Sequence, residues 1–218
     1  MPQKWVVWLA VDGDLRFLSH HDLMRAIERQ AVRAKIPLRY SQGFNPRPAL
    51  SLVLPRPVGL ASREDVLAIT LDAPLDASEL LDRLAAMAPK GLSPYRAAVL
   101  GPGVRPRARS ADIELALMPA QADHVAPRVR ALDDHPSWPM RRVTGDESLD
   151  DPLAGKAIDL RPLVRTLTVT DGGTLRLTLV PLDQAWARPA EILRLLNLDE
   201  RADLARMVRT HVDYGLEQ

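Results

Sequence analysis

Apolar and polar positions along the first hundred residues predict strands alternating with helices. Val and Trp dominate residues 4–10, as expected of a strand, and residues 15–18 are expected to continue it. Residues 19–35 instead repeat apolar side chains at helical spacing. Strands are expected over residues 4–10, 49–54, 65–71 and 95–100, and helices over residues 19–35 and 76–88. This βαββαβ order is that of a ferredoxin-like unit.

The second half follows a looser version of the same plan. Residues 101–110 are rich in Gly, Pro and Arg and predict a linker, and the acidic residues 145–155 predict a solvated loop. Strands are expected over residues 111–118, 138–143, 157–160, 163–170, 174–181 and 206–212, and helices over residues 120–132 and 189–196. We therefore expect an α+β protein of two tandem ferredoxin-like (βαββαβ) sandwiches, with domains at residues 1–100 and 111–218.

Composition removes several classes of chemistry. The 218 residues include no cysteine, which excludes disulfides, thiolate zinc sites, iron–sulfur ligation and thiol nucleophiles within the chain. The sequence has no P-loop and no G-x-G-x-x-G motif, so no cofactor is expected. Its apolar runs are too short for a membrane span or a secretory signal, which predicts a cytoplasmic protein without membrane contact.

Positive charge is concentrated in one stretch. Residues 16–63 carry nine Lys or Arg and two Asp or Glu, a net charge of +7 in a chain whose total is +1. A local excess of this size favours a polyanionic partner. The alternative is a solvated helix face that carries ordinary surface arginines. Ser62 and Asp65, at the end of this stretch, are expected to cap a short turn.

A Gly-, Asn- and Pro-containing segment follows the first helix and is the best candidate for a binding loop. Gly43 allows unusual backbone angles, and Pro46 holds Asn45 extended. Aromatic side chains beside arginines suit single-stranded or loop RNA. The alternative is a β-bulge with Phe44 in the core. The candidate RNA-binding residues are Arg16, Arg25, Arg29, Arg33, Arg39, Tyr40, Ser41, Gln42, Gly43, Phe44, Asn45 and Arg47.

Two adjacent histidines open the first helix. Ser19 and Asp22 have the spacing of a helix cap, which places His20 and His21 in the first turn. Metal-free RNA cleavage needs a base, an acid and a cation, so His20, His21 and Tyr40 are candidate catalytic residues. Phosphate contact and a purely structural role are the alternatives. Adjacent histidines do not share a helix face and no ligand spacing is present, so we expect no metal site.

Three strings carry a family resemblance: RFLSHHDLMRAIER, LRYSQGFNPRP and SLVLPRPVGLASRE. Through them, and through DLRP (159–162), RP (188–189) and RT (209–210), the chain resembles the radical-SAM-linked domain family, whose role is unsettled. The resemblance implies a separate radical SAM protein, encoded nearby, as a partner. The expected architecture also resembles, more weakly, the RAMP-superfamily CRISPR repeat-processing endoribonucleases, although a glycine-rich C-terminal loop is not evident.

We therefore expect a non-catalytic accessory protein that binds RNA, such as tRNA or rRNA, and acts with the radical SAM partner. One alternative is a metal-independent endoribonuclease that uses His20 or His21. Another is a scaffold whose basic face docks an acidic protein. The sequence does not indicate an oligomeric state.

Overall fold

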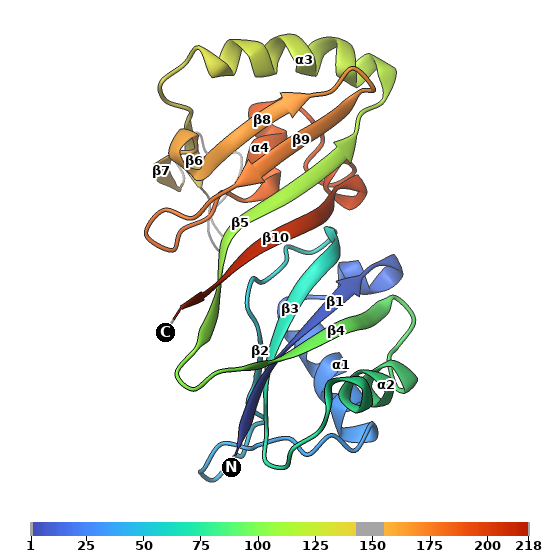
Figure 1. The fold of residues 1–218 in the computed structure, drawn as a ribbon. Helices are drawn as coiled ribbons and strands as arrows, with labels where there is room; N and C mark the ends of the chain where they lie inside the picture. Colours follow the sequence, from blue (N-terminus) through green and yellow to red (C-terminus); the bar gives the residue numbers. More distant parts are fainter. Residues whose placement is uncertain (1, 143–154, 218) are drawn as a thin grey trace. The chain divides into compact units, whose positions relative to one another are not determined.

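The computed structural model describes residues 2–142 and 155–217 and confirms an α+β protein (Figure 1). The chain forms two compact units. The first unit consists of two segments, residues 1–109 and residues 209–218. The second unit comprises Ser110–Val208. Among the described residues, no helix combines the length and apolar character needed to cross a membrane. The predicted acidic loop lies almost entirely outside the described residues.

The first unit is an antiparallel sheet with two helices. Its elements are β1 (Gln3–Val11), α1 (His20–Arg33), β2 (Leu50–Leu52), β3 (Ala61–Leu71), α2 (Ala77–Ala86) and β4 (Leu92–Leu100), joined by the last strand of the chain, β10 (Val208–Glu217). Strand β1 lies between β3 and β4. Strand β2 pairs with one end of β3, and β10 is also hydrogen-bonded to β3. The element order of residues 1–100 is the βαββαβ order predicted from the sequence.

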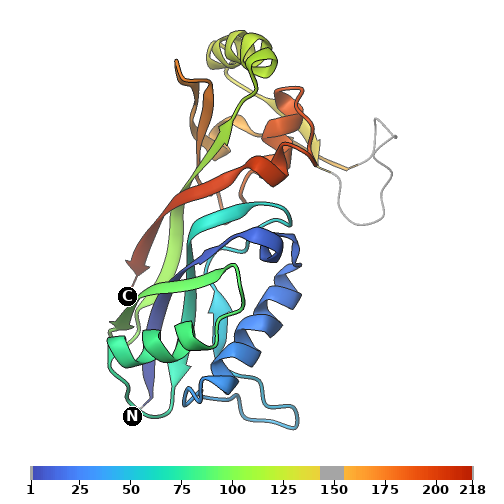
Figure 2. The ribbon, with the colours of Figure 1, turned by 90° about the vertical axis from the view of Figure 1, so that its right-hand side faces the viewer.

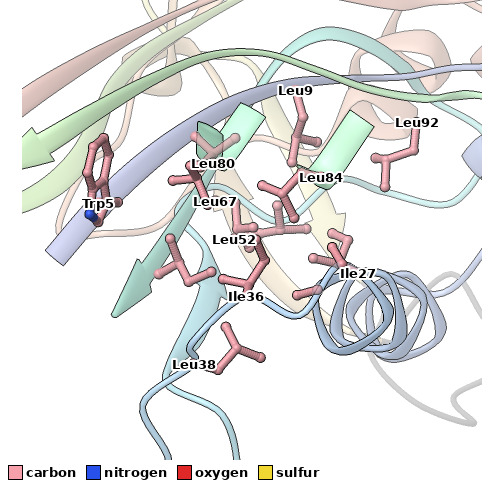
Figure 3. Packing of buried hydrophobic residues seen from close by; sticks show 14 of the residues in the cluster. Trp5, Leu9, Ile27, Ile36, Leu38, Leu52, Leu67, Leu80, Leu84 and Leu92 are labelled. Atoms are coloured by element: carbon pink, nitrogen blue, oxygen red, sulfur yellow. The ribbon is translucent and has the colours of Figure 1, made fainter. Parts of the chain in front are cut away.

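The core of this unit lies between the sheet and the two helices. Alternate residues of β1, including Trp5, Val7 and Leu9, face the helices because side chains of a strand point to opposite sides in turn. Ile27 of α1 and Leu80 and Leu84 of α2 lie among strand leucines such as Leu52 and Leu67 (Figure 3). Gln30, also buried, donates a 2.7 Å hydrogen bond to the Leu84 carbonyl and thereby links the two helices.

The predicted start of α1 is confirmed. The Ser19 hydroxyl accepts the Asp22 amide at 3.1 Å and donates to the Asp22 carboxylate at 2.7 Å, which satisfies helix donors that otherwise lack partners. Two local predictions were wrong. The segment before α1 is a 3-10 helix over Gly13–Phe17, not a continued strand. Ser62 and Asp65 lie inside β3, where both are buried, and not in a turn.

The second unit contains three paired antiparallel strands of the large sheet, two further strands and two helices. Its elements are β5 (Arg105–Ala116), α3 (Pro119–Asp133), β6 (Pro139–Arg142), β7 (Lys156–Asp159), β8 (Val164–Val169), β9 (Thr174–Leu179) and α4 (Pro189–Leu195). Strand β9 lies between β5 and β8, while β6 and β7 pair separately. Pro127 lies inside α3, and Pro189 occupies the first turn of α4 as predicted. Residues 105–110, which the sequence assigned to a linker, begin strand β5.

Candidate nucleic-acid interface

Helix α1 separates an apolar face from a basic one. Leu23, Ile27 and Ala31 are buried in the core. On the solvent side, Arg25, Arg29 and Arg33 are exposed and, together with Glu28 and Val32, line a hollow of about 440 Å³. Arg25 also pairs with Asp22 at 3.6 Å, and Arg33 donates to the Met87 carbonyl at 3.2 Å. These contacts hold two of the arginines near the helix and leave an excess of positive charge on its outer face.

The segment after α1 is a closed hairpin loop. Its arms join the end of β3, because the Arg39 amide donates to the Thr70 carbonyl at 2.8 Å and the Thr70 amide donates to the Ala49 carbonyl at 2.9 Å. Ser41 closes the loop twice: its amide donates to the Arg47 carbonyl at 2.8 Å, and its hydroxyl accepts the Arg47 amide at 2.9 Å. Residues 41–47, hereafter the binding loop, therefore extend from an anchored base.

Gly43 gives the binding loop its turn. Its φ is +141°, a backbone conformation that residues with a Cβ rarely adopt. A Cβ built there would meet nothing within 4 Å, so the requirement for glycine is one of backbone angle, not of space. This supports the sequence-based interpretation of Gly43.

Two aromatic rings of this region are exposed to solvent. Phe44 has a relative exposure of 106% and Tyr40 of 40%. The alternative that placed Phe44 in the core is therefore wrong. A fully exposed Phe leaves apolar surface in water, and such residues commonly mark a binding surface when they are grouped. Arg39, Gln42, Asn45 and Arg47 are exposed around these rings, so aromatic faces, amides and cations are presented together.

The histidines do not join this group. His20 is half-buried with its Nδ1 enclosed and without a partner among the described residues, whereas His21 is exposed. Their ring centroids are 5.7 Å apart. They begin α1, and Tyr40 follows its other end; a helix of 14 residues is about 21 Å long. Figure 2 shows the light-blue segment after α1 at the opposite end of the helix from its start. The three candidate catalytic residues thus form no common site.

Metal ligands show no grouping either. No cluster of three or more His, Asp or Glu side chains that could hold an ion occurs within residues 2–142 and 155–217.

Two cations counted in the basic stretch are not fully at the surface: Arg56 is buried and Arg16 is half-buried. Arg56 is 6% exposed and donates to the carbonyls of Arg16 at 2.8 Å, Pro57 at 3.3 Å and Leu15 at 3.3 Å, and also to that of Leu60. Arg16 is half-buried, and its guanidinium carbon lies 5.1 Å from the centre of the Phe17 ring. Arg56 must be removed from the predicted basic surface, and Arg16 contributes only in part.

Comparison with known proteins identifies the family. The family described as "Uncharacterized protein conserved in bacteria (DUF2344)" matches residues 4–194. The chain belongs to this family. No curated protein matches it. Among solved structures, it is similar to the crystal structure of an unknown protein from Galdieria sulphuraria, with 13% identity, 100% coverage of both chains and a TM-score of 0.27. A TM-score this low supports no inference about fold or function.

Sequence reasoning missed a buried ionic cluster in this DUF2344 chain. Asp65 is fully buried, and its Oδ1 accepts Arg209 Nη2 at 2.5 Å. Arg209 also donates to Ser62 Oγ and to the Leu54 carbonyl, at 3.3 and 3.1 Å. Burial lowers the pKa of Arg56, as does the charge of Arg209, and Asp65 opposes both. An aspartate at an inward position of an apolar strand was the available signal, but its partners are distant in sequence.

The other strings behind the resemblance have structural roles. Asp159 accepts the amides of Trp138 at 2.7 Å and Arg161 at 3.0 Å, and the Arg161 guanidinium carbon lies 5.1 Å from the Trp138 ring centre. Arg188 caps α4, where its amide donates to Glu191 at 2.8 Å. Of the strings quoted from the sequence, the one that contains the binding loop is the most exposed.

Proposed function

We propose that this DUF2344 protein is a non-catalytic RNA-binding protein whose binding loop recognises unpaired nucleotides. The observation that carries the proposal is the full exposure of Phe44 between Tyr40, Arg39 and Arg47 on an anchored hairpin. Unpaired bases stack on aromatic rings, while the phosphates that link them contact arginines. Tyr40 and Phe44 would hold bases, and Arg39 and Arg47 the adjoining phosphates.

The basic face of α1 would extend this contact. Arg25, Arg29 and Arg33 lie on the helix that leads into the hairpin, so a polyanion longer than the loop could engage both. Structured RNAs such as tRNA or rRNA combine unpaired loops with phosphate-rich duplexes. We propose that class of RNA, met in the cytoplasm, as the ligand.

The rival functions have less support. Endonuclease activity would require His20 or His21, which begin α1, to act together with Tyr40, and the segment after α1 that contains Tyr40 lies at the other end of the helix (Figure 2). Docking of an acidic protein would use the arginines but gives no role to a fully exposed Phe44. Competition by polyglutamate in the filter-binding experiment below tests this docking function.

We propose that the reaction served by this RNA contact takes place on another polypeptide. The chain has no cysteine and cannot ligate an iron–sulfur cluster with its own thiolates. A separate radical SAM protein is the partner that the sequence resemblance implies.

We further propose that both halves derive from the ferredoxin-like plan. Among the described elements of the second half, β5, α3, β8, β9, α4 and β10 follow one another in this order, with the paired strands β6 and β7 between α3 and β8.

Filter binding tests the proposal with total tRNA and an end-labelled hairpin RNA, in chelator, at two salt concentrations. The test variant is R39A/R47A. R130A/R165A removes the same charge from two exposed arginines of the second unit and is the matched control. We expect salt-sensitive binding that falls roughly tenfold in the test variant, because two phosphate contacts are lost, and that is unchanged in the control.

Equal losses in both double variants would contradict a localised RNA surface. Competition by polyglutamate as strong as that by RNA would favour docking of an acidic protein. Absence of binding at low salt would overturn the RNA proposal altogether.

A further inference from the structure

A second hollow lies on the first unit, away from the face of α1. Its volume is about 560 Å³, and it is lined by parts of β1, β2 and β3, by the end of β4 and by residues 104–106. Trp5 and Val7 pack on the helices, so Lys4 belongs with Val6 and Trp8 to the opposite face of the sheet. Lys4, Ala68 and Leu100 of the lining therefore lie on the face that α1 and α2 leave uncovered, whereas Trp5, Leu52 and Ile69 of the lining belong to the core on the helix side.

The lining of this hollow combines an apolar floor with positive charge. Ala68, Leu100 and Val104 supply apolar surface. Lys4 and Arg105 are its charged residues, both exposed, and no carboxylate of the described residues lines it. Its volume is in the range of about 300–1,000 Å³ typical of small-molecule sites. A flat apolar group attached to an anion, such as a nucleotide, matches this combination of shape and charge.

The hollow and the binding loop share one piece of chain. Pro48 and Ala49, which line the hollow, directly follow the loop, and the Ala49 amide donates to the Arg39 carbonyl at 2.8 Å. A strand of RNA held at the loop could therefore continue along this arm onto the sheet. The charges at both places have the same sign, as a continuous phosphate backbone requires.

We propose that this hollow holds a nucleotide of the same RNA that the binding loop engages, with Lys4 and Arg105 at its phosphates and the base over Ala68 and Leu100. The inference rests on the proposed function and adds a second contact region to it. It commits the occupant to single-stranded RNA, since Phe44 of the adjoining loop and Tyr40 just before the loop present aromatic rings and the hollow presents two cations.

Fluorescence anisotropy with a labelled single-stranded RNA dodecamer tests the site, in the full chain, over a range of salt concentrations. K4A/R105A removes the two cations of the hollow. K90A/R130A removes one exposed Lys and one exposed Arg elsewhere and is its control. S51W fills the hollow from β2 without a change of charge, and T168W places the same ring on an exposed position of β8.

We expect K4A/R105A to bind roughly tenfold more weakly and to reduce the slope of log K against log salt by about 1.4, since single strands contribute about 0.7 per phosphate contact. S51W should bind the RNA at least about fivefold more weakly, with little change in the slope of log K against log salt, because it displaces a base and not a cation contact. Both controls should bind as the wild type does.

The outcomes separate this inference from the proposed function. Binding that R39A/R47A weakens but that K4A/R105A and S51W leave unchanged overturns the hollow as a site and preserves the loop. A loss in K4A/R105A together with full binding by S51W also overturns it, since long-range attraction would then explain the charge effect. Absence of binding by the wild type overturns both. Unfolding temperatures equal to wild type exclude misfolding as the cause of a loss.

Discussion

At the scale of single residues, Phe44 and Asp65 reverse the usual placement of their side chains, because the apolar ring is exposed and the carboxylate is buried. The sequence alone does not show this difference. Phe44 is an apolar ring left fully in solvent, and Asp65 is a carboxylate with no exposure at all. A buried charge is costly unless another group offsets the cost, and an exposed ring leaves apolar surface that another group can cover. For Asp65 that group is Arg209, 2.5 Å away. For Phe44 we propose that it is an RNA base.

Replacement of Phe44 by Ala should weaken RNA binding without affecting the fold. A stacked base contributes about 1–3 kcal/mol, so we expect a loss of at least about fivefold in affinity at constant salt slope, because no charge is removed. Anisotropy measures the affinity and thermal unfolding the stability. F17A, at another exposed Phe, is the control and should bind normally. Unchanged binding by F44A would contradict stacking at the loop.

Replacement of Asp65 by Asn should destabilise the protein strongly. The change leaves the guanidinium groups of Arg56 and Arg209 buried without a counter-charge, and loss of one partner of a buried pair costs about 3–5 kcal/mol. E114Q, at the exposed pair with Arg176, should cost less than about 1 kcal/mol. Urea unfolding measures the loss in the free energy of unfolding for each variant. Equal losses in D65N and E114Q would contradict a larger contribution from the buried pair.

At the scale of elements, helix starts were predictable because their causes are local. Ser19 with Asp22 marks α1, and Pro189 the first turn of α4, within a few residues of sequence. Strand β3 was only partly predicted, because Ser62 and Asp65 resemble turn residues until Arg209, distant in the chain, pairs with them. Residues 105–110 resemble a linker because their strand carries exposed arginines in place of an apolar alternation.

Helix α2 should show a pH-dependent cap. Backbone hydrogen bonding from the Glu79 amide to Asp76 lowers the pKa of that carboxyl, as does the Ser78 hydroxyl. A lowered folded-state pKa means that the carboxylate stabilises the fold above the unfolded value of about 3.9, and that this effect is lost as pH falls through the folded value. D76A should therefore unfold a few degrees below wild type at pH 7, and the gap should close toward pH 2.

D76N provides the control for this pH dependence. Its amide oxygen can still accept the Glu79 amide but does not titrate, so its unfolding temperature should lie between those of the other two proteins at pH 7. A gap between wild type and D76A that persists unchanged to pH 2 would contradict an ionised cap.

At the scale of the whole molecule, the concentration of charge in residues 16–63 was readable from sequence, but its distribution was not. The count of cations includes Arg56, which the fold buries, and Arg16, which it half-buries. The separation of His20 from Tyr40 by a helix, in contrast, follows from the predicted helix, which α1 confirms. Sequence identified a basic region with aromatic residues; only the structure showed which of these residues share a surface.

Incubation with RNA should leave the RNA intact. The catalytic candidates do not meet, so a denaturing gel should show no fragments after prolonged incubation in chelator, for wild type and H20A/H21A alike. Fragments that end in cyclic phosphate, formed by the wild type and lost in the variant, would replace the binding role with a nuclease.

Photo-crosslinking to an RNA that contains 4-thiouridine at unpaired positions would locate the RNA on the protein. Trypsin does not cut before Pro48 or Pro57, so the binding loop is recovered in one peptide, residues 40–63. If the binding loop holds unpaired nucleotides, crosslinks concentrate in this peptide, at Tyr40 or Phe44, and F44A reduces them. Crosslinks confined to residues 110–208, or none in residues 40–63, would contradict binding at this loop.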